Sequence, residues 1–293
     1  MDKFTIYQLE QISGIKSHTI RMWENRYNAL HPERSNGNIR YYSGEQLRRL
    51  LNIVALQKSG YKIAQLSTSS NSELDNLILE NFVYTDKSAD DFTSIRNQLI
   101  GASATFNEAV FNIYFDKCVH NYGLVHTYQN IIYPLLQQVG LLWCSKQIPV
   151  SQEHFLSHLI LQKLYAAIEL LPEKPNSTDT WLLFLPENEF HIIGLLISSY
   201  ILQSRGKKVI FIGANTPESI INNIIDTVQI THVLFFKILH TQPDTLENYL
   251  KNIVKICKTQ KIHIAANNEV LNQIKNQKVI KLYSIKQLIE GVY

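Results

Sequence analysis

The stretch that most restricts the fold of this chain is residues 17–42, where a short helical pattern, a turn and a second basic and aromatic cluster follow one another. Ser17 can begin the helix, because a serine hydroxyl can accept a backbone N–H at a helix N-terminus. Before this stretch, residues 5–12 carry apolar side chains at helical spacing, and Ser13-Gly14 follows as a turn. Within it, Asn36-Gly37-Asn38 is a tight-turn sequence that would close a two-stranded wing. The pattern predicts a helix, a turn, a second helix and a wing.

Basic and aromatic side chains lie where such a fold would meet DNA, because a short helix of this kind fits the major groove. The residues expected at the DNA are Ser17, His18, Thr19, Arg21, Arg26, Tyr27, Arg34, Asn38, Arg40, Tyr41 and Tyr42. Residues 1–66 hold ten Lys and Arg against five Asp and Glu, a net charge of +5, whereas the remainder holds 18 against 20, a net −2. The positive charge is on the segment that would meet phosphates, so we expect a double-stranded DNA operator as partner.

Two short motifs of this segment resemble the MerR family of winged-helix transcription regulators. They are Thr19-Ile20-Arg21-Met22-Trp23-Glu24 and Asn38-Ile39-Arg40-Tyr41-Tyr42, and the resemblance covers residues 4 to about 66. Asn38 stands where the family usually has Gly, a mild change because Asn tolerates a positive φ. The resemblance implies a DNA-binding domain over residues 1–70 and a role in transcription regulation.

Length and composition limit the remaining possibilities. A chain of 293 residues with 45% hydrophobic residues can form two or three domains. It has no apolar run near the roughly 18 residues that span a membrane and no signal pattern, so we expect a cytoplasmic protein without membrane contact. The three cysteines form no CxxC pair, which argues against a disulfide framework or a zinc cluster. We also find no catalytic triad, paired catalytic carboxylates or Gly-rich phosphate loop, and so expect no enzyme.

Three blocks follow from the patterning, and together they predict a multidomain protein. Residues 67–72 (STSSNS) are a polar junction and the best linker candidate. Residues 73–175 have a helical pattern with breaks that suggest a bundle of four or five helices. Residues 178–293 alternate short apolar runs with amphipathic helices, which predicts an α/β domain with a doubly wound, flavodoxin-like parallel sheet of five strands. The expected strands are residues 181–185, 208–212, 232–236, 262–266 and 279–282.

In a doubly wound sheet, ligands bind beyond the carboxyl ends of the strands. The loop after the first expected strand contains Glu189-x-His191-x-x-Gly194. This resembles the (Asp/Glu)-x-His-x-x-Gly motif of cobalamin-binding domains, and the resemblance implies that His191 is the lower ligand of cobalt. A carboxylate two residues earlier can bond the other imidazole nitrogen and fix its tautomer. We expect Gly194 to let a bulky ligand tail pass close to the helix backbone.

A second motif lies in the helical block, where Trp143 is followed after nine residues by Glu153-His154. It resembles the helical bundles that cover the upper face of adenosylcobalamin in light-responsive, carotenoid-repressor-like MerR regulators. The resemblance implies that Trp143 packs on the adenosyl group and that Glu153 and His154 line the same cavity. Cys144 stands where the light-sensing members have a His, and a thiolate is a possible but different upper ligand for cobalt.

The α/β block departs from the cobalamin-binding pattern at three positions. Lys237 stands where the family has a small hydroxyl residue, and Ala265-Ala266 stands where it has a Gly pair. Those family residues make room for the nucleotide tail of the cofactor. The added methyl groups and the lysine side chain would crowd that space, so adenosylcobalamin and no cofactor both remain open.

The sequence therefore favours a cytoplasmic DNA-binding regulator, a repressor by resemblance, with a cobalamin-type sensory half. Ligand held between bundle and sheet would stabilise a homo-oligomer, a dimer or a tetramer, and loss or photolysis of the ligand would weaken DNA binding. One alternative is a MerR-type regulator whose degenerate sensory half serves only in oligomerisation or partner binding. Another is a corrinoid methyl carrier with an incidental N-terminal extension.

Overall fold

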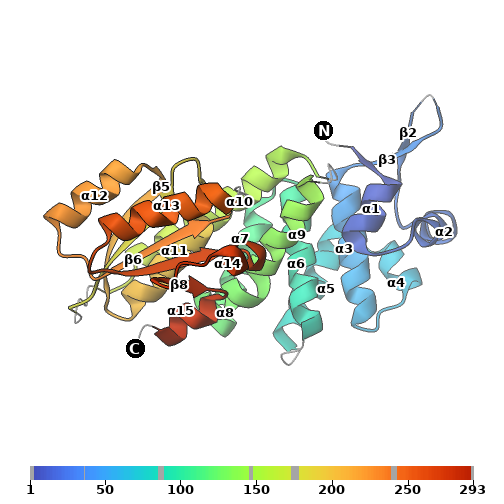
Figure 1. The fold of residues 1–293 in the computed structure, drawn as a ribbon. Helices are drawn as coiled ribbons and strands as arrows, with labels where there is room; N and C mark the ends of the chain where they lie inside the picture. The colour runs from blue at the N-terminus through green and yellow to red at the C-terminus, as the bar shows by residue number, and fades with distance from the viewer. Residues whose placement is uncertain are drawn as a thin grey trace. The chain divides into compact units, whose positions relative to one another are not determined.

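The computed structural model (Figure 1) describes residues 3–35, 37–84, 89–144, 148–172, 178–238 and 243–291. They fall into two compact units, residues 1–159 and residues 160–293. The first unit contains the predicted DNA-binding segment together with most of the predicted helical bundle, and the second contains the predicted α/β block.

The N-terminal segment folds as a winged helix-turn-helix, as predicted. Its three-stranded antiparallel sheet has the order β1-β3-β2, in which Phe4 pairs with Tyr42 and Arg34 with Arg40. Asn36, in the predicted turn, lies outside the described residues. The elements are β1 (Phe4–Thr5), α1 (Ile6–Ser13), α2 (Ser17–Tyr27), β2 (Glu33–Arg34), β3 (Arg40–Tyr42), α3 (Gly44–Lys58) and α4 (Ile63–Thr68).

Local side-chain contacts set the ends of the first two helices. Thr5 and Gln8 form a capping box at the start of α1, and Gly14 ends this helix with a φ of 74°. The expectation that Ser17 caps α2 is wrong. Lys16 occupies the N-cap position, and its side chain makes no capping hydrogen bond. Instead, the backbone N–H and the hydroxyl of Ser17 both donate to Glu10, at 2.9 and 2.7 Å. These bonds, with that from Lys16, lower the pKa of Glu10 to about 2.

The middle of the chain is helical throughout its described residues, which confirms the predicted bundle. Leu124 to Cys144 runs without interruption through α8, a π-helical turn and α9. The helices are α5 (Asn71–Tyr84), α6 (Ala89–Ala104), α7 (Glu108–Tyr122), α8 (Leu124–Thr127), the π-helix η1 (Tyr128–Ile132), α9 (Tyr133–Cys144) and α10 (Val150–Glu169).

The polar junction at residues 67–72 is not an open linker, and this corrects the interpretation of the sequence. The guanidinium of Arg49 donates to the carbonyls of Ser67 and Ser69 at 2.8 and 2.9 Å and to the Asn71 side chain at 2.9 Å. An ion pair of 2.5 Å joins Arg48 of α3 to Asp75 of α5. The helix-turn-helix segment and the following helices therefore pack as parts of one unit.

The second unit is a doubly wound α/β domain, as predicted. Its five parallel strands have the order β5-β4-β6-β7-β8. One apolar core lies under α11 and α15, and a second lies under α12, α13 and α14 on the other face. The strands are β4 (Thr180–Pro186), β5 (Lys208–Thr216), β6 (His232–Lys237), β7 (Lys261–Ala266) and β8 (Val279–Leu282), and the helices are α11 (Ile193–Ser204), α12 (Glu218–Thr227), α13 (Pro243–Ile256), α14 (Asn268–Gln273) and α15 (Ile285–Gly291).

The strand order places the first strand, β4, between β5 and β6. The chain leaves β4 toward β5 on one side and later returns to β6 on the other, so the switch point lies at the carboxyl ends of β4 and β6. The loop with Glu189 and His191 follows β4, and Lys237 ends β6. The fold therefore brings these predicted site residues to one edge of the sheet.

No helix in the described part of the chain combines the length and the apolar character needed to cross a membrane.

Candidate functional sites

The outward face of α2 carries a stripe of polar and basic side chains. His18, Arg21, Met22, Asn25 and Arg26 are all exposed, at the spacing of three and four residues that places them on one side of a helix. The opposite side, with Ile20 and Trp23, is buried against the rest of the fold. Of the other predicted contacts on α2, Ser17, Thr19 and Tyr27 are half-buried.

Two residues of this stripe were missing from the residues predicted at the DNA. They are Met22, which is 46% exposed, and Asn25. Their spacing from His18 and Arg21 would have been sufficient to find them.

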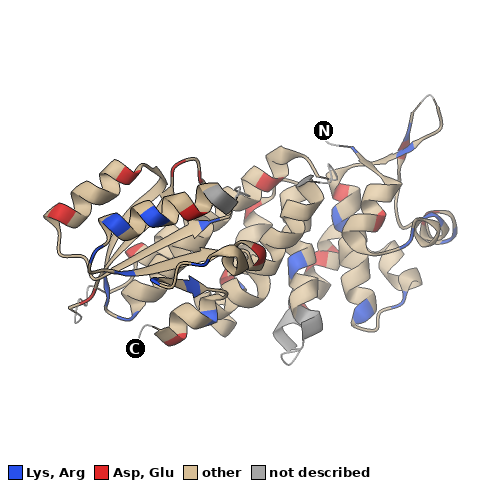
Figure 2. Ribbon diagram, in the orientation of Figure 1, with Lys and Arg blue, Asp and Glu red and all other residues tan. Residues whose placement is uncertain are grey.

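Basic residues, coloured blue in Figure 2, also lie in the wing. Arg34 and Asn38 are exposed, and the guanidinium of Arg34 donates to the Asn38 side chain at 2.5 Å. Asn38 has a φ of 59°, which confirms that Asn tolerates a positive φ at this position. Tyr41 is half-buried in β3.

A buried carboxylate joins the wing to the recognition helix. Glu24 of α2 is 9% exposed and accepts hydrogen bonds from the Tyr42 hydroxyl and from Arg40 Nε, the latter at 3.1 Å. Tyr42 is fully buried, and burial together with the nearby Glu24 carboxylate raises its pKa. The prediction that Tyr42 contacts DNA is therefore wrong, because its side chain belongs to the core that fixes the wing.

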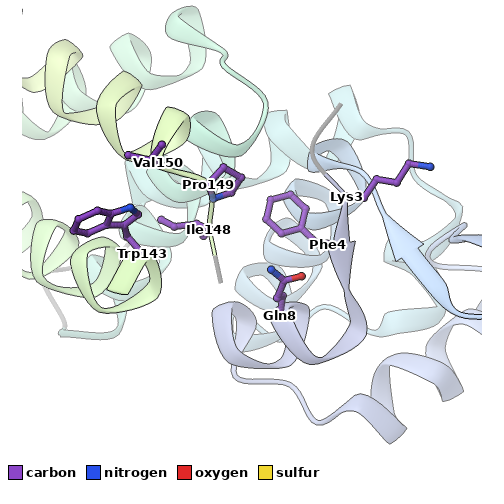
Figure 3. A pocket seen from close by; sticks show the side chains of 7 residues that line it. All are labelled: Lys3, Phe4, Gln8, Trp143, Ile148, Pro149 and Val150. Atoms are coloured by element: carbon purple, nitrogen blue, oxygen red, sulfur yellow. The ribbon is translucent and has the colours of Figure 1, made fainter. Parts of the chain in front are cut away.

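Trp143 lies at the end of α9 and is accessible. It is 46% exposed, whereas Trp23 and Trp181 are 5% and 2% exposed and belong to the core. Figure 3 shows Trp143 and Ile148–Val150 on one side of a cavity of about 350 Å³ and Phe4 and Gln8 on the other. This exposure separates Trp143 from an ordinary core tryptophan and leaves its indole open to a ligand.

Glu153 and His154 lie in the first turns of α10. Glu153 Oε1 accepts from the Ser157 hydroxyl at 2.7 Å, and its Oε2 lies 3.5 Å from His154 Nε2. Neither residue is among those that line the cavity at Trp143 within the described part of the chain, so the structure does not bring the three predicted residues into that one cavity. The side chain of Cys144, the possible upper ligand, lies outside what the structure describes.

Glu189 and His191 form the pair that the sequence predicted. His191 Nδ1 lies 2.5 Å from Glu189 Oε1, so the carboxylate fixes the ring through this nitrogen. The Glu189 side chain is fully buried, while that of His191 is 53% exposed. In such a pair, a metal ion is bound through the other nitrogen, Nε2. His191 could therefore hold a metal ion such as cobalt through Nε2.

Two residues at the end of β6 contact the second carboxylate oxygen of Glu189. Its Oε2 accepts the backbone N–H of Ile238 at 2.9 Å and lies 4.0 Å from Lys237 Nζ. The Lys237 side chain is only 13% exposed. A fully buried carboxylate needs such partners, because burying an uncompensated charge is costly. Lys237 thus extends the Glu189–His191 pair into a three-residue cluster at the switch point.

Gly194 lies in the first turn of α11, where its role differs from the one expected. A Cβ at this position would be 2.8 Å from Cε1 of Phe236, so the aromatic ring already occupies the space beside the glycine. Phe236 pairs in the sheet with Ala265, whose side chain packs in the same core under α11. Ala266 packs in the core on the other face of the sheet. Of the predicted alanine pair, only Ala265 is on the side of Gly194.

A stack of three rings lies in the core under α11, in the strands that carry this site. Trp181 is stacked on His232 with ring centroids 4.3 Å apart, and its centroid is 4.9 Å from that of His263. His263 is 8% exposed, and neither ring nitrogen has a hydrogen-bond partner among the described residues. Burial lowers the pKa of His263 to about 4, with a further contribution from the adjacent His232.

Comparison with known families gives two separate matches. Residues 4–72 match the family model described as MerR HTH family regulatory protein, and residues 95–168 match the family model described as B12 binding domain. The second match includes Trp143, Glu153 and His154. The chain thus combines a segment similar to MerR regulators with a segment similar to B12 binding domains. The resemblance of the N-terminal segment to the MerR family is confirmed, and so is that of the helical block to B12-binding proteins, whereas the Glu189-x-His191-x-x-Gly194 motif lies outside both matched ranges.

Two transcriptional repressors are similar to this chain over most of its length. The protein is 26% identical to the HTH-type transcriptional repressor CarA of Myxococcus xanthus over 86% of this chain and 82% of the relative. It is 24% identical to the HTH-type transcriptional repressor CarH of the same organism, over 71% of this chain and 69% of the relative.

A solved structure has a similar fold over two thirds of the chain. The monomethylamine corrinoid protein of Methanosarcina barkeri superposes with a TM-score of 0.53 at 12% identity, over 68% of this chain and 97% of that protein. At this identity the likeness concerns the fold alone.

Proposed function

We propose that the protein is a DNA-binding transcriptional repressor whose DNA affinity is set by an adenosylated cobalamin held in its B12-type half. The observation that carries the proposal is that two features occur in one chain. Helix α2 has an exposed stripe of basic residues, and the buried Glu189 carboxylate fixes the exposed His191. The chain is also similar to two repressors over most of its length.

The DNA-binding part of the proposal rests on α2 and the wing. The helix would lie in the major groove with His18, Arg21 and Arg26 toward the DNA, and Arg34 and Arg40 would meet the backbone from the wing. Thr19, Tyr27, Asn38 and Tyr41 remain candidates for further contacts. Because each phosphate contact releases counterions, affinity should fall steeply with salt.

The sensory part of the proposal rests on His191. Its imidazole would bind the cobalt from below, with Glu189 holding the ring in position. Trp143, Glu153 and His154 keep the role that the resemblance implies, contact with the adenosyl group. Bound adenosylcobalamin would supply a cobalt–carbon bond that light breaks.

The proposed switch acts through assembly. A ligand that binds one oligomeric state better than another shifts the population toward it, and a dimer or tetramer would present several winged helices to repeated half-sites. Loss of the ligand would then lower DNA affinity through loss of multivalency.

The ligand-binding part is tested by mixing the full chain with adenosylcobalamin in the dark, removing unbound ligand and recording the visible spectrum before and after illumination. The proposal predicts a retained corrinoid spectrum that changes in light and is lost in His191→Ala. The matched control is His158→Ala, which removes an exposed imidazole from α10 and should leave the retained spectrum unchanged.

A second candidate function is a MerR-type regulator whose B12-type half serves only in oligomerisation or partner binding. The packing of Phe236 on Gly194 and the burial of Lys237 favour it, because both fill space at the switch point. Sequence-specific DNA binding without any retained corrinoid would select this candidate.

A further inference from the structure

Beside Gly194, three residues after His191, the ring of Phe236 occupies the α11 face of the sheet. Phe236 comes so close to Gly194 that a Cβ there would lie 2.8 Å from its Cε1 and 3.1 Å from its Cδ1. The neighbouring strand places Ala265 beside Phe236 in the sheet. The first turn of α11 and the ends of β6 and β7 therefore meet across an aromatic ring.

The last residue of β6 closes the adjoining space. The Lys237 side chain is 13% exposed, its Nζ lies 4.0 Å from the buried Glu189 carboxylate, and the Ile238 N–H bonds the same oxygen. Moving Lys237 aside would weaken the charge balance of a fully buried carboxylate, which is costly. Lys237 and Ile238, which contact the carboxylate that holds His191, thus also lie where a tail entering beside the end of β6 would pass.

The packing of Phe236 and Lys237 limits where the nucleotide tail of a corrinoid bound through His191 can lie. When an imidazole of the protein takes the lower position, the nucleotide base of a cobalamin is displaced and its tail extends from the same face of the corrin ring. The tail must then either enter the domain beside His191 or remain outside it. A tail that entered the domain at the first turn of α11 would meet the ring of Phe236, which lies against Gly194.

We propose that the sheet domain holds a corrinoid through His191 without taking in its nucleotide tail, so that a corrinoid lacking the nucleotide binds at least as well as cobalamin. This rests on the proposed sensory function and specifies the class of ligand for that site.

The direct test compares adenosylcobalamin with adenosylcobinamide, which lacks the nucleotide, by equilibrium dialysis of the full chain in the dark. The proposal predicts dissociation constants that agree within about threefold or favour adenosylcobinamide. A preference of more than about tenfold for adenosylcobalamin would overturn it, because such a preference requires contacts with the tail. If neither corrinoid binds, the proposed sensory function itself fails.

A second readout reports the tail directly. The nucleotide loop of cobalamin carries a phosphodiester, so the ³¹P NMR line of the bound ligand reports how freely the tail moves. The proposal predicts a narrow line for a tail in solvent. A line broadened to the tumbling of the whole protein would show that the tail is held and would overturn the proposal.

The role of Phe236 is tested by Phe236→Ala, with Phe236→Leu as the variant that better preserves the core. Opening the space should improve the affinity for adenosylcobalamin relative to adenosylcobinamide by about tenfold. Phe211→Ala is the matched control, because it removes a ring from the same core under α11 without touching Gly194. If the ratio of affinities is the same in all these variants, Phe236 does not exclude the tail and the proposal fails.

Discussion

Glu24 in the first unit and Glu189 in the second are both buried carboxylates, but their partners give them different roles. Glu24 bonds Tyr42 and Arg40, and the fully buried Tyr42 helps to join the recognition helix to the wing. Glu189 bonds a backbone N–H within the domain and an imidazole that is 53% exposed. The first carboxylate holds α2 and the wing together, and the second fixes one exposed side chain, the proposed corrinoid ligand His191. The same residue type thus has a structural role in one unit and a positioning role in the other.

The largest effect is expected at Glu24. Glu24→Ala leaves the buried Tyr42 hydroxyl and Arg40 without their acceptor and should lower the free energy of unfolding of the first unit by about 3–5 kcal/mol. Urea denaturation at neutral pH measures it. Glu45→Ala, at an exposed position in α3, is the control and should change stability by about 0.5 kcal/mol or less. If Glu24→Ala changes stability as little as Glu45→Ala does, Glu24 has no structural role, and the contrast drawn between Glu24 and Glu189 fails.

The second-largest effect is a loss of stability of the second unit as the pH falls. His263 has its pKa lowered to about 4 in the folded protein, against about 6.5 in an unfolded chain. Above pH 6.5 both states are neutral and this stabilisation is complete. As the pH falls from about 6.5 to about 4, the unfolded state takes up the proton first, so about 3 kcal/mol of stability should be lost.

Thermal or urea unfolding between pH 7.5 and 4 measures this loss, and His232, whose pKa is also lowered by burial, acts in the same direction. The variant His263→Phe should have a flatter pH profile than the wild type. His31→Phe, which removes an exposed histidine from the first unit, is the control. Equal pH profiles for all three proteins would contradict the assignment to His263.

A smaller effect is expected at Glu189 when only the charge is removed. Glu189→Gln keeps the shape of the side chain but weakens its hold on His191, so corrinoid affinity should fall by about 10–100-fold. Equilibrium dialysis in the dark provides the measurement. Glu187→Gln alters an exposed carboxylate of the same loop and should leave the affinity unchanged. If the two variants bind alike, Glu189 does not position the ligand.

The smallest effect tests the stripe on α2. Asn25→Ala should weaken binding to a DNA site selected from a random duplex library by about 1 kcal/mol, because an asparagine that reads an adenine forms two hydrogen bonds. Asn223→Ala, on an exposed part of α12, serves as the control. Repeating the library selection with Asn25→Ala shows which base pair is read, and an unchanged motif would remove Asn25 from the interface.

The sequence was sufficient to predict the elements and the residues that lie next to one another along the chain. The strands from β4 to β8 follow directly from apolar runs, and the Glu189–His191 contact follows from a spacing of two residues. Long-range packing was not predictable in the same way. The burial of Tyr42 involves a hydrogen bond to Glu24, 18 residues away, and the role of Gly194 in α11 depends on Phe236 in β6.

Local chemistry also misled the prediction at two points. Ser17 has the composition of a helix cap, but the carboxylate of Glu10 from the preceding helix takes over the bonding at that end. Residues 67–72 have the composition of a linker, but Arg49 from α3 binds their carbonyls. In both cases a charged side chain from another element supplies hydrogen bonds that the local sequence does not reveal.

The most direct test of the account measures the affinity of the full chain for its selected DNA site, without ligand, with adenosylcobalamin in the dark, and after illumination of the same sample. The account predicts that the ligand raises the affinity in the dark by at least about tenfold and that light abolishes the gain. The same affinity under all three conditions would contradict it, because the B12-type half would then have no influence on DNA binding.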